Sequence, residues 1–329
     1  MNNSRVDEAI RLVEELKKGS IRGLSKLITL VENDLPGARN AMETLYPLTG
    51  KSCIIGITGS PGVGKSTLTD RVTRELRNHN YSVGIIAVDP TSPFTGGALL
   101  GDRVRMQDIS RDEEVFIRSL ATRGSLGGLS RSTADVIKVM DAFGKDFIIV
   151  ETVGVGQDEI DIVKTADVTI VTVIPGAGDE IQTIKAGIME IGDIFVVNKG
   201  DRSGADKLVA EIQSMVAMGN RTQEWIPPVV STIAVQSEGV AELVEKIFDY
   251  RRFQEEKDIL DEKRKERSRE EITNMIEYEI SKYVHKILQV DLPFEEILDD
   301  IVAKKKNPYS LVKEVVEPFA KAFEKGMSQ

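Results

Sequence analysis

Residues 53–67 read Cys53-Ile-Ile-Gly-Ile-Thr-Gly-Ser-Pro-Gly-Val-Gly-Lys-Ser-Thr67. The apolar start of this stretch is typical of a buried strand. Gly59, four further residues and then Gly64-Lys65-Ser66 match the phosphate-binding P-loop, and residues 67–72 can open a helix behind it. The glycines allow successive backbone N–H groups to turn toward an anion, and the helix N-terminus adds partial positive charge. The stretch therefore predicts a nucleotide-binding domain.

Two side chains of this loop have separate predicted roles. Lys65 would reach the β and γ phosphates of a nucleotide, and the Ser66 hydroxyl would bind Mg²⁺. The predicted phosphate-binding residues are Gly59, Ser60, Pro61, Gly62, Val63, Gly64, Lys65, Ser66 and Thr67.

Composition narrows the class of protein. The 329 residues are 41% hydrophobic and 29% charged, as in a soluble globular protein, and the net charge of −10 disfavours a nucleic-acid partner. The single cysteine, Cys53, leaves no intramolecular disulfide and fits a reducing cytosol, so we expect a cytoplasmic protein. An amphipathic N-terminus argues against a signal peptide, and the chain has no apolar run of about 18 residues, so we expect no membrane association.

Strand and helix patterns alternate along the middle of the chain. Apolar runs at 82–88, 147–150, 168–174, 194–197 and 228–233 predict strands, and the segments between several of them predict helices. The alternation predicts an α/β fold of the P-loop NTPase type, with a mostly parallel, doubly wound sheet. We predict a helical N-terminal extension at 1–50, a nucleotide-binding domain at 51–250 and a helical C-terminal arm at 251–329.

The C-terminal arm combines two patterns. Residues 251–271 contain 8 basic and 8 acidic residues without proline or glycine, which is typical of a long helix with a charged, solvated surface. From Ile272 to Leu288 apolar residues recur at helical spacing and predict a further helix with an apolar stripe. We expect this stripe to pack against a second copy of the chain, which would make the protein a homodimer.

Asn198-Lys199-x-Asp201, at the end of an apolar strand, indicates which base is bound. Guanine presents N1–H and an N2 amino group as donors, and the Asp201 carboxylate can accept from both. Asn198 and Lys199 would brace the ring and the loop, so GTP is favoured over ATP. The next loop reads Val230-Ser-Thr-Ile-Ala-Val-Gln-Ser-Glu-Gly239 and lacks the Ser-Ala pair expected there. The backbone N–H groups of Ile233, Ala234 and Val235 are then the expected base contacts.

Hard oxygen ligands for Mg²⁺ follow other strands. The candidates are Asp89, Asp102 and Glu151, directly or through water, beside Ser66. Together with Lys65 these carboxylates are also the candidate catalytic residues. Val155 occupies the position where Ras-like enzymes carry a glutamine that orients water, so we expect slow GTP hydrolysis that a partner protein accelerates.

Several motifs in fixed order resemble one known family. They are the P-loop with Asp89-Pro90, Gly101-Asp-Arg-Val-Arg-Met106, Thr122-Arg-Gly-Ser-Leu-Gly-Gly128, Glu151-Thr-Val-Gly-Val-Gly-Gln157 and Asn198-Lys-Gly-Asp201. Over essentially the whole chain this pattern resembles the MeaB/ArgK family, the GTPase chaperones of adenosylcobalamin-dependent methylmalonyl-CoA mutase.

The resemblance implies a Mg²⁺-dependent GTPase that gates cobalamin loading and protects the mutase from inactivation. Gly178-Asp-Glu-Ile-Gln-Thr-Ile-Lys185 matches the extra switch loop of that family, which implies that Asp179, Gln182 and Lys185 relay the nucleotide state to the partner. The C-terminal arm would form the dimer. No cobalamin site is assigned on this chain.

Three alternatives stay open at this point. A nickel metallochaperone GTPase needs Cys and His ligands, but the chain has one Cys and two separated histidines. A transport-protein kinase would use ATP, which the predicted guanine contact at Asp201 disfavours. In a nucleotide-gated scaffold, hydrolysis would be incidental to partner binding.

Overall fold

A computed structural model of the chain describes residues 2–89, 108–121, 131–152, 165–176, 191–219, 224–286, 294–313 and 316–317. These residues form two compact units, 1–267 and 268–329. The three-part domain division at residues 50 and 250 stays a prediction. Within the described residues, no helix combines the length and the apolar character that crossing a bilayer requires.

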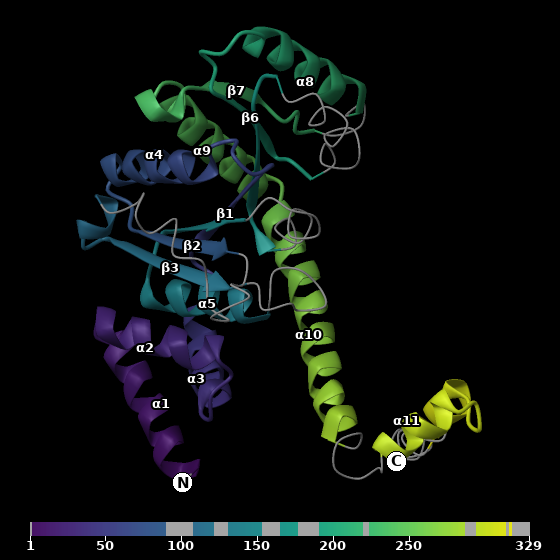
Figure 1. Cartoon of the computed structure of the whole chain (residues 1–329). Helices are drawn as coiled ribbons and strands as arrows, with labels where there is room; N and C mark the ends of the chain where they lie inside the picture. The colour runs from purple at the N-terminus through teal and green to yellow at the C-terminus, as the bar shows by residue number, and fades with distance from the viewer. Residues whose placement is uncertain are drawn as a thin grey trace. The chain divides into compact units, whose positions relative to one another are not determined.

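The first unit is built on a seven-stranded parallel sheet (Figure 1). Its strands are β1 (Cys53–Thr58), β2 (Val83–Asp89), β3 (Val115–Ala121), β4 (Phe147–Glu151), β5 (Val168–Val173), β6 (Ile194–Asn198) and β7 (Val229–Thr232). In space they follow the order β3-β2-β4-β1-β5-β6-β7, and every neighbouring pair is parallel. This confirms the predicted α/β fold with a parallel sheet.

Helices cover both faces of the sheet because its strands are apolar on both sides. The covering helices are α4 (Lys65–Asn78) and α9 (Val240–Glu256) on one face, and α5 (Arg131–Phe143) and α8 (Ala205–Gly219) on the other. Alternate residues of β1 divide between the two faces: Ile55 packs with α4 and α9, and Ile54 packs with α5. The central strand β1 is thus buried on both sides, and the loop that follows it lies at the middle of the carboxyl edge.

Three N-terminal helices extend the layer that contains α5. They are α1 (Asn2–Lys17), α2 (Ile21–Glu32) and α3 (Ala38–Leu45), and η1 (Tyr46–Leu48) follows them. Leu24 and Ile28 on α2 share one apolar core with Val136 of α5. Arg118 on β3 adds an ion pair to Glu32, so the predicted N-terminal helices are packed on the sheet unit.

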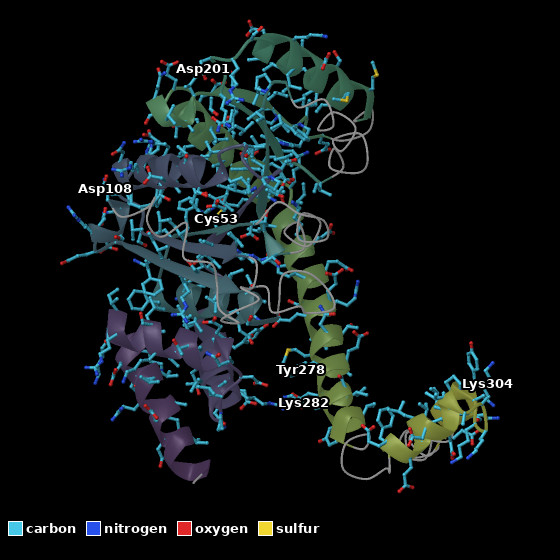
Figure 2. All side chains as sticks on the ribbon, viewed as in Figure 1. Cys53, Asp108, Asp201, Tyr278, Lys282 and Lys304 are labelled. Atoms are coloured by element: carbon cyan, nitrogen blue, oxygen red, sulfur yellow. The ribbon has the colours of Figure 1, made fainter. Side chains whose placement is uncertain are left out.

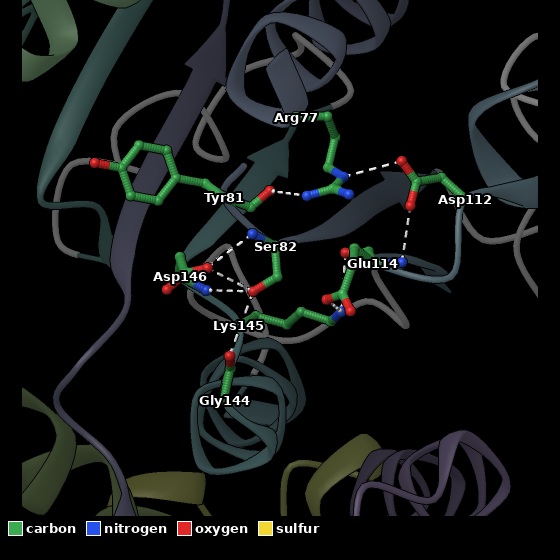
Figure 3. Close-up of polar contacts among 8 residues, drawn as sticks. All are labelled: Arg77, Tyr81, Ser82, Asp112, Glu114, Gly144, Lys145 and Asp146. Atoms are coloured by element: carbon green, nitrogen blue, oxygen red, sulfur yellow. Dashed lines mark hydrogen bonds and ion pairs between the residues drawn. The ribbon is translucent and has the colours of Figure 1, made fainter. Parts of the chain in front are cut away.

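The amino edge of the sheet is held by polar contacts away from the P-loop (Figure 3). The backbone N–H and the hydroxyl of Ser82 both donate to Asp146 Oδ2, at 2.7 and 2.8 Å. Lys145 Nζ donates to the carbonyl of Glu114 at 2.9 Å, and burial lowers the pKa of this lysine. These contacts join the starts of β2, β3 and β4, and they leave the carboxyl edge available for a ligand.

The C-terminal helices begin and end at different residues than the sequence predicts. Helix α9 ends at Glu256, and Asp258 takes a left-handed backbone conformation with φ of +57°. A single helix, α10 (Ile259–Lys286), then spans both the charged and the apolar patterns, and α11 (Phe294–Val302) follows. Aspartate tolerates this conformation better than most residues, but nothing in the sequence pattern marks this one for a break.

The start of α10 is bound to the sheet unit, where the sequence predicts a solvated charged face. Arg267 donates to Asp167 Oδ1 at 2.9 Å, and Arg264 donates to the carbonyl of Gly50 at 2.8 Å. Lys263 Nζ lies 3.5 Å from Asp193 Oδ1. The prediction that this charged surface faces solvent is therefore wrong for these three residues, because they bind groups at the amino ends of β1, β5 and β6.

Candidate nucleotide-binding site

The predicted P-loop lies between β1 and α4, and two of its glycines leave no room for a side chain. Gly59 has φ of +138°, and a Cβ there would lie 2.1 Å from the carbonyl oxygen of Thr172. Gly64 has φ of +101°, and its Cβ would lie 2.5 Å from Nδ2 of Asn198. The loop is therefore shaped by close approach to β5 and β6 as well as by its own turn.

Lys65 is the first residue of α4 and its side chain folds back over the loop. The residue is only 6% exposed, and Nζ donates to the carbonyls of Gly59 at 2.6 Å and Ser60 at 3.2 Å. A buried ammonium needs such acceptors. Phosphate oxygens would compete with these carbonyls as partners, which is the role predicted for this lysine.

Ser66, in the first turn of α4, meets Glu151 at the carboxyl end of β4. The Ser66 hydroxyl donates to Oε1 of Glu151 at 2.5 Å, and Glu151, the last residue of β4, is 4% exposed. A hydroxyl and a carboxylate this close are hard oxygen donors of the kind that Mg²⁺ prefers, so this pair fits one side of a magnesium site.

The remaining predicted metal ligands are less fully described. Asp89 ends β2, two residues beyond Ala87, which pairs with Glu151 in the sheet. Asp102 lies outside the described residues, as do the predicted partner-coupling residues Asp179, Gln182 and Lys185. Among the residues that the structure describes, no three acidic, histidine or cysteine side chains form a metal-binding group.

Asn198 connects the P-loop to the loop after β7. It is 2% exposed, and its Nδ2 donates to the carbonyl of Val63 at 2.8 Å. Its Oδ1 accepts from the Thr232 hydroxyl at 3.1 Å and from the backbone N–H of Ala234 at 3.2 Å. Thr232 is a positioning residue that the sequence reasoning missed. Its only sequence signal is a polar residue at the end of an apolar strand.

The other two residues of the Asn-Lys-x-Asp motif, Lys199 and Asp201, differ in their contacts. Lys199, with φ of +57°, donates from Nζ to the carbonyl of Gly62 at 2.7 Å, so its stem runs along the P-loop. Asp201 is exposed and is labelled in Figure 2. The motif thus combines a buried side chain at Asn198 with an exposed carboxylate at Asp201, and base recognition by Asp201 stays a prediction.

The loop after β7 contains η4 (Ala234–Gln236). The N–H of Ile233 donates to the carbonyl of Glu238 at 3.1 Å, and that of Ala234 donates to Asn198. Val235 is 69% exposed. Two of the three N–H groups predicted to contact a base are therefore used within the protein, and base contact by this loop stays a prediction.

This geometry defines a class of protein. An all-parallel sheet with a P-loop after its central strand, and with Asn-Lys-x-Asp after a strand on one side of it, is the arrangement of a P-loop GTPase. A family model described as methylmalonyl Co-A mutase-associated GTPase MeaB matches residues 24–288. The chain belongs to the MeaB family, and it is a GTPase, a hydrolase acting on GTP.

Individual relatives agree with this assignment. A putative GTPase of Pyrococcus horikoshii is 53% identical over 309 residues, which cover 93% of this chain and 96% of the relative. GTPase ArgK of Escherichia coli is 32% identical over 318 residues, covering 94% of each chain. The methylmalonic aciduria type A homolog of Caenorhabditis elegans is 34% identical and covers 84% of this chain and 74% of the relative.

A solved structure has the same fold. A crystal structure described as an LAO/AO transport system kinase superimposes with a TM-score of 0.71 at 25% identity. The match covers 97% of this chain and 99% of the other.

Proposed function

We propose that this GTPase gates the loading of adenosylcobalamin onto methylmalonyl-CoA mutase, or a related acyl-CoA mutase, and protects the loaded mutase. The observation that carries the proposal is the family match over residues 24–288, because the family is described as mutase-associated. The similarity to a protein named for methylmalonic aciduria supports the same partner. A cytoplasmic location stays a prediction from the cysteine content.

A bound phosphate would replace the hydrogen-bond acceptors that the P-loop backbone now offers to the Lys65 ammonium. The Lys65 ammonium would leave the carbonyls of Gly59 and Ser60 for the β and γ phosphates. Ser66 and Glu151, with Asp89 and Asp102, are the residues we propose to hold Mg²⁺. Bound Mg²⁺ supplies neutralisation of the charge that develops on the transferred phosphoryl group.

The contact between Ser66 and Glu151 suggests how nucleotide state is transmitted. The Ser66 oxygen could give a lone pair to a bound metal ion and still donate its proton to Glu151, so this hydrogen bond would tie the end of β4 to the metal site. Glu151 precedes residues 153–164, and β5 leads toward residues 177–190, which contain Asp179, Gln182 and Lys185. We propose that these two segments carry the state of the γ phosphate to the mutase.

Hydrolysis without the mutase should be slow. Val155 offers no polar group to orient water, so we propose that partner binding completes the catalytic arrangement. Equal single-turnover rates with and without the mutase would contradict this part of the proposal.

We also propose that the second unit forms a homodimer through α10. Ile272, Ile276, Ile280 and Tyr283 recur at helical spacing and are 59, 54, 47 and 65% exposed. Light scattering should give a dimer, and Ile276→Asp with Ile280→Asp should give a monomer. Asn274→Asp with Ser281→Asp adds the same charge on the opposite side of the helix and should stay dimeric. A dimer in the first double variant would contradict the proposal.

The partner proposal is tested by capture on immobilised mutase. The full chain is loaded with GDP or with a non-hydrolysable GTP analogue, each with Mg²⁺, and retention is compared. We expect the two states to differ about tenfold or more in affinity, and Lys65→Ala to abolish the difference. Equal retention in both states would overturn the gating role. Transfer of labelled γ phosphate to a protein substrate would instead support the kinase alternative.

A further inference from the structure

A cavity of about 550 Å³ lies beside α4, away from the P-loop. Its walls come from α4, from the segment around η2 (Ile109–Arg111) and from the first turn of α9. Arg71, Arg74 and Arg77 line it from α4. Arg71 is six residues beyond Lys65, which is about 9 Å along a helix axis, so the cavity is separate from the phosphate-binding loop.

Two of these arginines already have carboxylate partners. Arg74 binds both oxygens of Asp70, with Nε to Oδ2 at 2.9 Å and Nη2 to Oδ1 at 3.3 Å. Arg77 donates from Nε to Asp112 Oδ2 at 2.9 Å and from Nη1 to the carbonyl of Tyr81 (Figure 3). Their charges are therefore largely neutralised inside the protein.

Arg71 differs from the other two arginines. Its Nε lies 3.6 Å from Asp70 Oδ2, an oxygen that already accepts from Arg74. That Nε atom is enclosed and has no hydrogen-bond partner among the residues that the structure describes. Because one carboxylate faces two guanidinium groups, Arg71 has unused capacity to bind a second anion.

The opposite wall of the cavity, formed by the start of α9, also favours a negatively charged ligand. Val240 and Ala241, the first two residues of α9, line the cavity, and Gly239 before them provides no side-chain cap. The backbone N–H groups at a helix start carry partial positive charge. Three carboxylates of the wall oppose an anion: Asp112 is paired with Arg77, Glu75 lines the cavity from α4, and Asp108 lines it and is exposed (Figure 2).

We propose that this cavity binds a small oxyanion, a phosphate or carboxylate group, through Arg71 and the start of α9. The guanidinium fork matches the paired oxygens of either group. The bound anion would join α4, which begins at the P-loop, to α9, which follows the loop after β7. The site goes beyond GTP hydrolysis and does not depend on the identity of the protein partner.

The test uses the full chain loaded with a non-hydrolysable GTP analogue and Mg²⁺, so that the phosphate positions of the P-loop are filled. Inorganic phosphate and succinate are titrated separately by calorimetry, with the ionic strength held constant by chloride. We expect saturable binding of at least one probe, weakened about tenfold or more by Arg71→Gln. Binding of phosphate alone, or of succinate alone, identifies which group the site takes.

Three further variants sharpen the test. Asp108→Asn should strengthen binding severalfold, because it removes an exposed carboxylate from the cavity wall, and Arg71→Lys should restore part of the affinity that Arg71→Gln loses. Arg39→Gln removes a charge from a side chain on α3 that is 73% exposed, and it should change nothing. Absence of saturable binding by both probes, or equal affinity in wild type and Arg71→Gln, would overturn the proposal.

Discussion

The side-chain amide of Asn198 donates a 2.8 Å hydrogen bond to the carbonyl of Val63, across 135 residues of sequence. The same side chain accepts hydrogen bonds from Thr232 and Ala234. One buried amide therefore sets the phosphate-binding loop and the loop after β7 relative to each other. We propose that this relationship preforms the site for both the phosphates and the base of a nucleotide.

Removing that amide should weaken both folding and nucleotide binding. Asn198→Ala leaves three partners, the Val63 carbonyl, the Thr232 hydroxyl and the Ala234 N–H, without these hydrogen bonds. Each buried polar group left unpaired costs about 1–3 kcal/mol of stability. We expect the free energy of unfolding in urea to fall by about 3 kcal/mol or more, and GTP affinity to fall about tenfold or more. Asn78→Ala, whose side chain makes only an exposed contact to Glu75, is the matched control. A stable variant with unchanged affinity would contradict this role.

A comparison of Gly64 and Gly144, which both have positive φ, separates backbone strain from steric clash. Gly64→Ala combines strain with a Cβ only 2.5 Å from Asn198 Nδ2, and should abolish nucleotide binding. Gly144→Ala, at φ of +100° with nothing within 4 Å of the added Cβ, should cost about 1 kcal/mol of stability and leave GTP binding intact. Nucleotide titration and urea unfolding of both variants measure the difference. If both variants lost GTP binding to the same extent, the clash with Asn198 would not be its cause.

The sequence was sufficient to predict the sheet class and the P-loop, because these depend on local apolar runs and fixed spacings, while base recognition by the Asn-Lys-x-Asp motif stays a prediction. It could not predict the break at Asp258, which rests on the conformation of one residue. It also did not distinguish Arg267, which binds buried Asp167, from the other charged residues of 251–271. Charged residues on a helix look alike in sequence, and only tertiary packing decides which of them find buried partners.

Cys53 should make stability fall at alkaline pH. Burial, reinforced by the nearby Asp167 carboxylate, raises the pKa of its thiol from 9.0 to about 12. The unfolded chain loses this proton near pH 9 while the folded chain keeps it, so the contribution is complete below pH 9 and is lost as pH rises toward 12. Between pH 9 and 10.5 wild type should lose about 2 kcal/mol more than Cys53→Ala in urea unfolding. Parallel pH profiles would contradict the burial of this thiol.

The ion pair between Arg267 and Asp167 should anchor the start of α10. The side chain of Asp167 is 2% exposed, and its other oxygen accepts from the N–H of Ile54. Arg267→Met leaves that carboxylate without its cation and should lower stability by about 1–3 kcal/mol, since Arg267 is itself partly exposed. Hydrogen exchange should then increase in residues 259–267.

The control for that anchor is Arg252→Met. Arg252 makes an ion pair with Asp249 in which both side chains are exposed, and such pairs contribute about 0–1 kcal/mol. Unchanged hydrogen exchange at 259–267 in Arg267→Met would mean that other contacts hold the helix.

The most direct test of the account is a competition between guanine and adenine nucleotides for a fluorescent GTP analogue bound to the full chain with Mg²⁺. We predict that GTP displaces the probe at a concentration at least about a hundredfold lower than ATP, because the Asp201 carboxylate would accept from the N1–H and N2 amino groups of guanine, which adenine lacks. In Asp201→Asn most of this preference should disappear. Equal displacement of the probe by GTP and ATP from the wild-type chain would contradict the account.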